Sequence, residues 1–188
     1  MKLSIKNMVC DRCIKVVREE LEALGLTVEQ IELGSVQLAG TLSAGQAQQV
    51  KARLEANGFE LLEDARLVLV EYMKKLIIDE VQHLKARKPA QMNFSDYLSE
   101  KCGYEYSHLS HLFSATTGQT VEQYIIAQKI EKVKEWLSYG ELSMTEIAWR
   151  LGYSSAAHLG NQFKKVTGLT PGQYKKDAGL VRKTLDQV

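Results

Sequence analysis

The chain of 188 residues has room for two small domains, and its 45% hydrophobic and 25% charged residues are typical of a soluble globular protein. It contains no apolar stretch of roughly 18 residues that could span a bilayer, and residues 1–6 lack a signal-peptide pattern, so we expect a cytoplasmic protein with no membrane partner. The net charge of +1 neither supports nor excludes DNA binding, and three cysteines do not form a secreted disulfide framework.

Residues 2–63 alternate short strand patterns with helix patterns. The elements are a strand over 3–6, a helix ended by Gly25, strands over 28–33 and 36–42, a helix from Ser43 to Asn57-Gly58, and a strand over 59–62. The order βαββαβ predicts a ferredoxin-like domain over residues 1–64, with two helices packed on one face of a four-stranded sheet.

Cys10-x-x-Cys13 lies where the first strand ends and the first helix begins. The partial positive charge of a helix N-terminus, together with Arg12, favours the ionised thiolates. Thiolate pairs select soft ions such as Cu(I). Cys10 and Cys13 are therefore a candidate metal site for Cu(I) or another thiophilic ion.

Met8-Val9-Cys10-Asp11-Arg12-Cys13 resembles the M-x-C-x-x-C site of heavy-metal-associated domains. The resemblance implies that both cysteines bind the metal and that Met8 packs beneath the loop without ligating. It also implies that Phe59 lies in a loop beside the metal. Val9 stands in place of an acidic residue, which disfavours an ion that wants an oxygen ligand, such as Zn(II).

Other interpretations of the first domain remain open. It could be a dimerisation or ligand-sensing module with two incidental cysteines. A thioredoxin-like redox site would need a cis-proline against Cys10 and Cys13. The only prolines are Pro89 and Pro171, and neither is near the cysteines in the sequence, which disfavours redox catalysis. A DNA-repair methyl acceptor would need a four-cysteine zinc site, which the chain lacks.

The pattern is helical from Ala65 onward. An apolar stripe predicts a helix over 66–86 that stops before Pro89, and the stripe comprises Val70, Met73, Ile77, Val81 and Leu84. Only a few residues separate the last strand from this helix, and the junction lies at residues 64–66. We therefore expect the two domains to be tightly joined. A conformational change in one domain would then be transmitted to the other.

Six further helices are predicted over 94–102, 105–116, 121–138, 144–150, 155–166 and 171–176. Four of them start with capping signals, which are Asn93 with Asp96, Thr120 with Gln123, Ser143 with Glu146, and Thr170 with Gln173. The helix over 121–138 would span about 27 Å at ~1.5 Å per residue. That is close to the roughly 34 Å between successive major-groove faces on one side of DNA.

Residues 98–124 and 147–174 share one frame. Leu98, Gly103 and Tyr104 recur 49 residues later as Ile147, Gly152 and Tyr153. His108, Leu109 and Phe113 recur 50 residues later as His158, Leu159 and Phe163, and Thr117-Gly118-x-Thr120-x-x-Gln123-Tyr124 returns as Thr167-Gly168-x-Thr170-x-x-Gln173-Tyr174. Each copy has an apolar helix, a glycine turn and a second helix with a polar outer face, the layout of a helix-turn-helix DNA reader.

The second copy carries, in order, Glu146-Ile147-Ala148, Leu151-Gly152-Tyr153-Ser154, Phe163-Lys164-Lys165, Thr167-Gly168-x-Thr170-Pro171 and Tyr174. This run resembles the AraC-type (AraC/XylS) DNA-binding domain, and the resemblance extends over about residues 66–177. It implies a seven-helix domain over 65–188 with two helix-turn-helix motifs, in a transcription regulator rather than an enzyme. Double-stranded DNA is the implied partner, with RNA polymerase and a second copy of the chain as further candidates.

The family pattern also assigns roles to single residues. The implied base contacts are Tyr106, Ser107, Ser110 and His111 in the first motif, and Ser155, Ala156, Ala157, Gly160 and Asn161 in the second. Lys164 and Lys165 are placed for phosphates. The expected core of the second motif is Ile147, Ala148, Leu151, Leu159 and Phe163.

Some residues depart from that pattern. The side chains at the predicted base-contact positions of the second motif, its reading face, are small. Gly160 inside a helix should lower the free energy of unfolding by roughly 1 kcal/mol relative to Ala. Asn161 and Gln162 can read adenine, whereas Ala can only meet a thymine methyl. His108 and His158 occupy equivalent places, which favours a positional role over metal binding, and Cys102 falls at a core position as an inert thiol.

The sequence therefore supports a cytoplasmic regulator in which a soft-metal sensor domain is fused to an AraC-type DNA-binding domain. One alternative is a constitutive regulator whose first domain only dimerises. Another is a metal chaperone or redox protein that its helical half tethers to DNA.

Overall fold

The computed structural model describes residues 1–84, 88–89, 91–176 and 185–186. The chain divides into two compact units, Met1–Leu76 with Lys88–Gly118 and Ile77–Arg87 with Gln119–Val188. The first unit holds a small sheet domain and the first predicted DNA-reading motif, and the second unit holds the other motif. The domain boundary expected after residue 64 stays a prediction.

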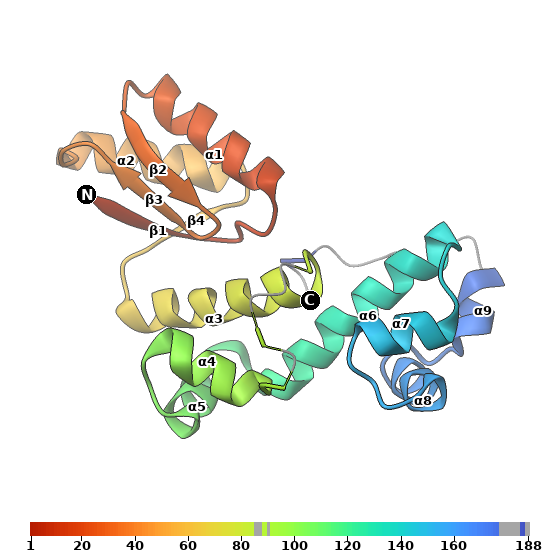
Figure 1. The fold of residues 1–188 in the computed structure, drawn as a ribbon. Coiled ribbons are helices and arrows are strands. Elements are labelled where there is room, and N and C mark those ends of the chain that lie inside the picture. The colour runs from red at the N-terminus through yellow and green to blue at the C-terminus, as the bar shows by residue number, and fades with distance from the viewer. Residues whose placement is uncertain (85–87, 90, 177–184, 187–188) are drawn as a thin grey trace. The chain divides into compact units, whose positions relative to one another are not determined.

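Four strands of the first unit form one antiparallel sheet in the order β2-β3-β1-β4 (Figure 1). They are β1 (Lys2–Lys6), β2 (Val28–Glu32), β3 (Ser35–Leu38) and β4 (Glu60–Leu62). The helices α1 (Asp11–Ala23) and α2 (Ala44–Ala56) follow β1 and β3 in the chain, as the sequence predicts. The predicted α+β class is confirmed.

Both helices share one hydrophobic core with the sheet. Alternation along β1 turns Leu3 and Ile5 into this core, where Val17 of α1 and Val50 of α2 are fully buried. The strand predicted over 36–42 is shorter than expected. It ends at Leu38, and Gly40 two residues later has a φ of +76°, which breaks the extended conformation.

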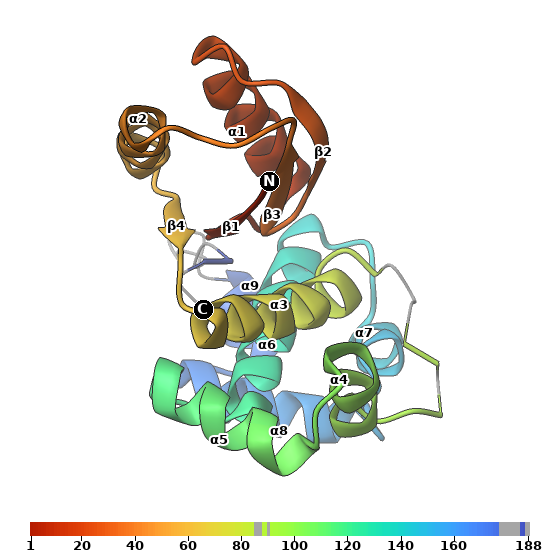
Figure 2. The same ribbon diagram turned by 90° about the vertical axis from the view of Figure 1, so that its left-hand side faces the viewer.

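The chain passes from β4 into α3 (Ala65–Val81) through residues 63–64 (Figure 2). Val70, Met73, Ile77 and Val81 are buried, as predicted. The prediction that the helix runs to residue 86 and its stripe to Leu84 is wrong for residues 82–84, and residues 85–86 lie outside the described part of the chain. Leu84 lies beyond the helix, is 43% exposed and has a φ of +49°. A left-handed residue cannot continue a right-handed helix, and side-chain periodicity does not reveal it.

The remaining helices agree with the predicted ranges to within one residue. They are α4 (Phe94–Cys102) and α5 (Tyr106–Thr117) in the first unit, and α6 (Val121–Tyr139), α7 (Met144–Arg150), α8 (Ala156–Thr167) and α9 (Pro171–Lys176) in the second. All four predicted capping pairs are present as hydrogen bonds. Within the described residues, no helix is both long and apolar enough to cross a membrane.

Candidate DNA-binding surface and cysteine loop

The first helix-turn-helix motif consists of α4, a turn and α5. Gly103 closes α4 in the left-handed conformation, with a φ of +73°, so the chain can reverse within three residues. Leu98 on α4 and Leu109 and Phe113 on α5 are completely buried and hold the two helices together. The outer surface of α5 is left free of this packing.

The second motif, α7, a turn and α8, repeats this arrangement. Gly152 has a φ of +70° in the turn, and all five residues predicted for the core are buried, Ile147, Ala148, Leu151, Leu159 and Phe163. The core prediction for this motif is confirmed. Because each motif keeps its apolar residues inside, its polar residues remain on the outer face of the second helix.

The two equivalent histidines pack against the turns. The ring of His108 lies 5.4 Å from that of Tyr104, and the ring of His158 lies 5.3 Å from that of Tyr153. The Nδ1 atom of His158 is also 3.0 Å from the Ser154 hydroxyl oxygen. These contacts give both histidines the positional role that the sequence predicts. In the described part of the chain, no group of three or more His, Cys, Asp or Glu side chains could hold a metal ion.

The two reading helices have the same order of exposure. Along residues 106–113 and 156–163, the sequence of half-buried, exposed and buried positions is identical. Among the predicted base-contact residues, Ser107, His111, Ala157 and Asn161 are exposed, and Tyr106, Ser110, Ala156 and Gly160 are half-buried. Each motif therefore presents an accessible surface at the residues chosen from the sequence.

Ser155 has a defined local role beside its predicted contact with DNA. It is the N-cap of α8, and its hydroxyl oxygen accepts a hydrogen bond of 3.1 Å from the backbone N–H of His158. The first motif has Glu105 at the equivalent place, without a side-chain cap. Capping explains Ser155 without DNA, so its contact with DNA stays a prediction.

Lys164 and Lys165 are exposed in the last turn of α8. Cations at a helix C-terminus also interact favourably with the helix dipole, so these lysines have a structural role that is compatible with phosphate contact. Trp149 on α7 is 80% exposed, and the sequence analysis did not predict this exposed aromatic side chain. Ala148 and Leu151, which lie on either side of it in the chain, are buried, and this spacing places Trp149 on the outer face of the short helix.

Cys10 and Cys13 lie together at the start of α1. Cys10 is the extended N-cap of the helix, and its sulfur atom is 3.5 Å from that of Cys13. The Asn7 side chain donates a 2.9 Å hydrogen bond to the carbonyl oxygen of Gly58, which ties this loop to the loop before β4. The two thiols are thus held on one short, anchored segment.

Burial raises the pKa of the Cys13 thiol above its ordinary value. The prediction that the helix N-terminus and Arg12 favour the ionised form is therefore wrong for Cys13, because desolvation outweighs the backbone hydrogen bonds that lower the pKa. Met8 is buried and Phe59 is 7% exposed, and both belong to the core of the sheet domain. Cys102 is half-buried, and burial raises its pKa to about 11, as expected of an inert thiol.

Comparison with known proteins matches the helical half of the chain. Residues 98–177 match a family described as "Helix-turn-helix domain". An uncharacterized HTH-type transcriptional regulator of Staphylococcus aureus is 39% identical over 84 residues, 45% of this chain and 11% of the relative. The uncharacterized HTH-type transcriptional regulator YtdP of Bacillus subtilis is 26% identical over 102 residues, 54% of this chain and 13% of the relative. The chain thus covers about a tenth of the length of these relatives.

A solved structure has the same fold. The C-terminal domain of AraT, a response regulator from Geobacillus stearothermophilus, aligns with a TM-score of 0.50 at 23% identity. The alignment covers 62% of this chain and 90% of that domain. Taken with the repeated motifs and the capped helices, the family match identifies residues 98–177 as a helix-turn-helix domain.

Proposed function

We propose that the protein is a transcription regulator that binds double-stranded DNA at specific sequences through both helix-turn-helix motifs. The observation that carries this proposal is the identical order of exposure along α5 and α8. A single helix with a polar outer face is common in any helical protein. Two such helices, in two copies of one motif and within a matched helix-turn-helix family, favour DNA recognition.

The predicted residues then divide into two groups. His111 and Asn161 occupy equivalent exposed positions on α5 and α8 and carry side chains that can bond to base edges. Lys164 and Lys165 would contact phosphates, which position the protein without reading the sequence. With Ala157 and Gly160 on the second face, the second motif would contribute more shape fit and phosphate contact than base readout.

Helix α6 joins the two motifs in the chain. Its 19 residues span about 28 Å at ~1.5 Å per residue. We propose that, on DNA, α5 and α8 enter successive major-groove segments, which lie about one DNA turn apart. RNA polymerase and a second copy of the chain are further candidate partners.

Footprinting on genomic fragments tests the regulator proposal. Specific binding is typically ~10³–10⁷-fold tighter than non-specific binding by the same protein. We therefore expect protection of defined sites at concentrations that leave random DNA unprotected. Protection that is no tighter on any fragment than on random DNA would contradict the proposal.

A second candidate function concerns the first domain, whose element and strand orders support a ferredoxin-like fold. We propose that Cys10 and Cys13 capture Cu(I) or another thiophilic ion and that this changes DNA affinity. The 3.5 Å between the two sulfur atoms supports this proposal, because a single ion can contact two sulfur atoms that lie this close together. The ion can change DNA affinity only to the extent that it binds the DNA-binding conformation and the non-binding conformation of the protein with different affinities.

The alternatives for this domain make distinct predictions. A domain that only dimerises leaves DNA binding independent of copper, and a tethered metal chaperone binds copper without changing DNA binding. Promoter occupancy measured with and without Cu(I), for wild-type protein and for the Cys10→Ser/Cys13→Ser double variant, separates them. A response to Cu(I) in the wild type alone supports the sensor. An equal response in both proteins would contradict it.

A further inference from the structure

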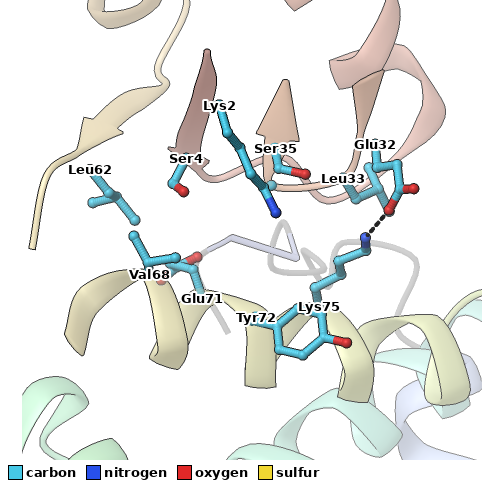
Figure 3. Close-up of a pocket in the computed structure, with 11 residues that line it drawn as sticks. Lys2, Ser4, Glu32, Leu33, Ser35, Leu62, Val68, Glu71, Tyr72 and Lys75 are labelled. Atoms are coloured by element: carbon cyan, nitrogen blue, oxygen red, sulfur yellow. Dashed lines mark hydrogen bonds and ion pairs between the residues drawn. The ribbon is translucent and has the colours of Figure 1, made fainter. Parts of the chain in front are cut away.

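A pocket of about 370 Å³ lies in the first unit, between the sheet and α3 (Figure 3). It lies on the face of the sheet opposite the core that the sheet shares with α1 and α2. Ligand sites are commonly concave spaces of about 300–1,000 Å³, and 370 Å³ equals roughly a dozen water volumes. The volume is therefore sufficient for a small organic molecule.

The floor of the pocket is one row of residues across all four strands. Strand register places Glu32 opposite Ser35, Ser35 opposite Ser4, and Ser4 opposite Leu62. Directly opposed residues of antiparallel strands project from the same face of the sheet. All four line the pocket, so the floor is polar at the β2 end and apolar at the β4 end.

The other wall is one stripe of α3. Val68, Glu71, Tyr72 and Lys75 recur at spacings of three and four residues, so they share one face of the helix. An ion pair of 3.1 Å between Lys75 of α3 and Glu32 of the sheet connects the two sides of the pocket at the polar end (Figure 3). Leu62, only 7% exposed, and Val68 form the apolar end.

Charges around the pocket are paired with one exception. Lys75 pairs with Glu32, and Glu71 pairs with Lys74 at 2.8 Å. The ammonium group of Lys2 points into the space between the sheet and α3, and within the described residues it has no ion pair or hydrogen bond (Figure 3). The four charged residues of the lining balance, but Glu71 is neutralised by Lys74 from outside the lining, which leaves the Lys2 ammonium group unpaired beside the hydroxyl groups of Ser4 and Ser35.

We propose that this pocket binds a small organic monocarboxylate. The carboxylate pairs with Lys2 and accepts hydrogen bonds from the Ser4 and Ser35 hydroxyl groups, and the apolar body of the ligand packs against Leu62 and Val68. A carboxylate fits because charge-assisted hydrogen bonds compensate its desolvation, whereas a cation would meet an unpaired ammonium group. Binding itself does not depend on the proposed regulator function, and only an effect of the ligand on DNA affinity would rest on it.

Titration of the full chain, without DNA, tests the proposal. The probes are straight-chain and phenyl-substituted monocarboxylates, each compared with its uncharged amide by calorimetry. We expect at least one acid to bind with one-to-one stoichiometry, with affinity about tenfold higher than its amide and about tenfold higher than for the Lys2→Gln variant. Ser35→Leu, which narrows the pocket without changing its charge, should also abolish binding.

Lys6→Gln is the matched control. Lys6 lies on the same strand and the same face as Lys2, but it pairs with Glu60 at 2.7 Å and does not line the pocket. This variant should bind the acid as wild type does. The proposal is overturned if no acid binds more tightly than its amide, or if Lys2→Gln and Lys6→Gln have the same effect.

Discussion

The rings of Phe163 and Tyr174 meet edge to face, with centroids 5.5 Å apart and planes at 79°. Phe163 is completely buried, and Tyr174 is 8% exposed. This pair joins α8 to α9, so α9 stabilises the helix that carries the second set of predicted base contacts. Aromatic pairs of this geometry contribute about 0.5–1.5 kcal/mol beyond the burial of their surface.

Phe163→Ala should therefore lower the free energy of unfolding by ~3–5 kcal/mol, because it empties a core site and removes the ring contact. Chemical denaturation, followed by circular dichroism, measures this change. Lys165→Ala, an exposed change on the same helix, should stay within about 0.5 kcal/mol of wild type. Equal midpoints for wild type and Phe163→Ala would show that the core assignment is wrong.

A substitution at Gly160 tests whether α8 contacts DNA, because its effects on stability and on DNA affinity can be measured separately. A Cβ atom at this position meets no atom within 4 Å, and the backbone is helical, so Gly160→Ala should stabilise the protein by about 0.5–1 kcal/mol. On a reading face, the added methyl group should also change the affinity for a selected duplex. Gly45→Ala in α2, where a Cβ is equally unobstructed, should stabilise without changing DNA binding. Unchanged affinity for Gly160→Ala would place this residue away from DNA.

The start of α7 should make stability depend on pH. Hydrogen bonds from the side chain and backbone of Ser143 lower the pKa of Glu146. A carboxyl group whose pKa is lower in the folded state stabilises above its unfolded pKa, and this contribution is lost as the pH falls through the folded pKa.

Ser143→Ala should accordingly cost ~1 kcal/mol at pH 7 through the lost helix cap. The difference from wild type should shrink as the pH falls into the acid range through the lowered pKa of Glu146, because the carboxylate then becomes protonated. Denaturation of both proteins across this pH range measures the effect, and Thr145→Ala provides an exposed neighbour as control. A difference that does not vary with pH would mean that Glu146 takes no part in the cap.

The cysteine loop should bind about one Cu(I) per monomer, far more tightly than Zn(II), because two thiolates cannot close a four-ligand zinc shell. Competition with a Cu(I) chelator under reducing conditions measures both affinities. Cys10→Ser and Cys13→Ser should each abolish tight binding, and Cys102→Ser should have little effect.

The affinity for Cu(I) measured in this competition should depend on pH. Burial raises the pKa of Cys13, so at neutral pH the ion must displace a proton, and the affinity should increase as the pH rises from about 6 to 8. Copper retained by the Cys10→Ser/Cys13→Ser double variant would place the site elsewhere. A wild-type protein that takes up none would leave the first domain without a metal function.

Local rules predicted much of the helical half. Capping pairs, turn glycines and the 49- and 50-residue repeat depend on residues close in sequence, and they located α4 to α9 and their buried positions. Leu84 was placed wrongly because it continues the three-residue spacing of the stripe while its backbone is left-handed. The pocket beneath α3 was missed because Lys2, Ser35 and Lys75 are far apart in sequence and meet only through strand register and helix packing.

Hydroxyl-radical footprinting on one selected duplex tests the central claim, that the two motifs read successive turns of DNA. At saturating protein, wild type should protect two blocks centred about 10–10.5 base pairs apart on one side of the helix. His111→Ala should weaken protection of one block and Asn161→Ala that of the other, each with a loss of ~1–3 kcal/mol in specific binding. A single protected block, or two variants that bind and protect as wild type does, would contradict the account.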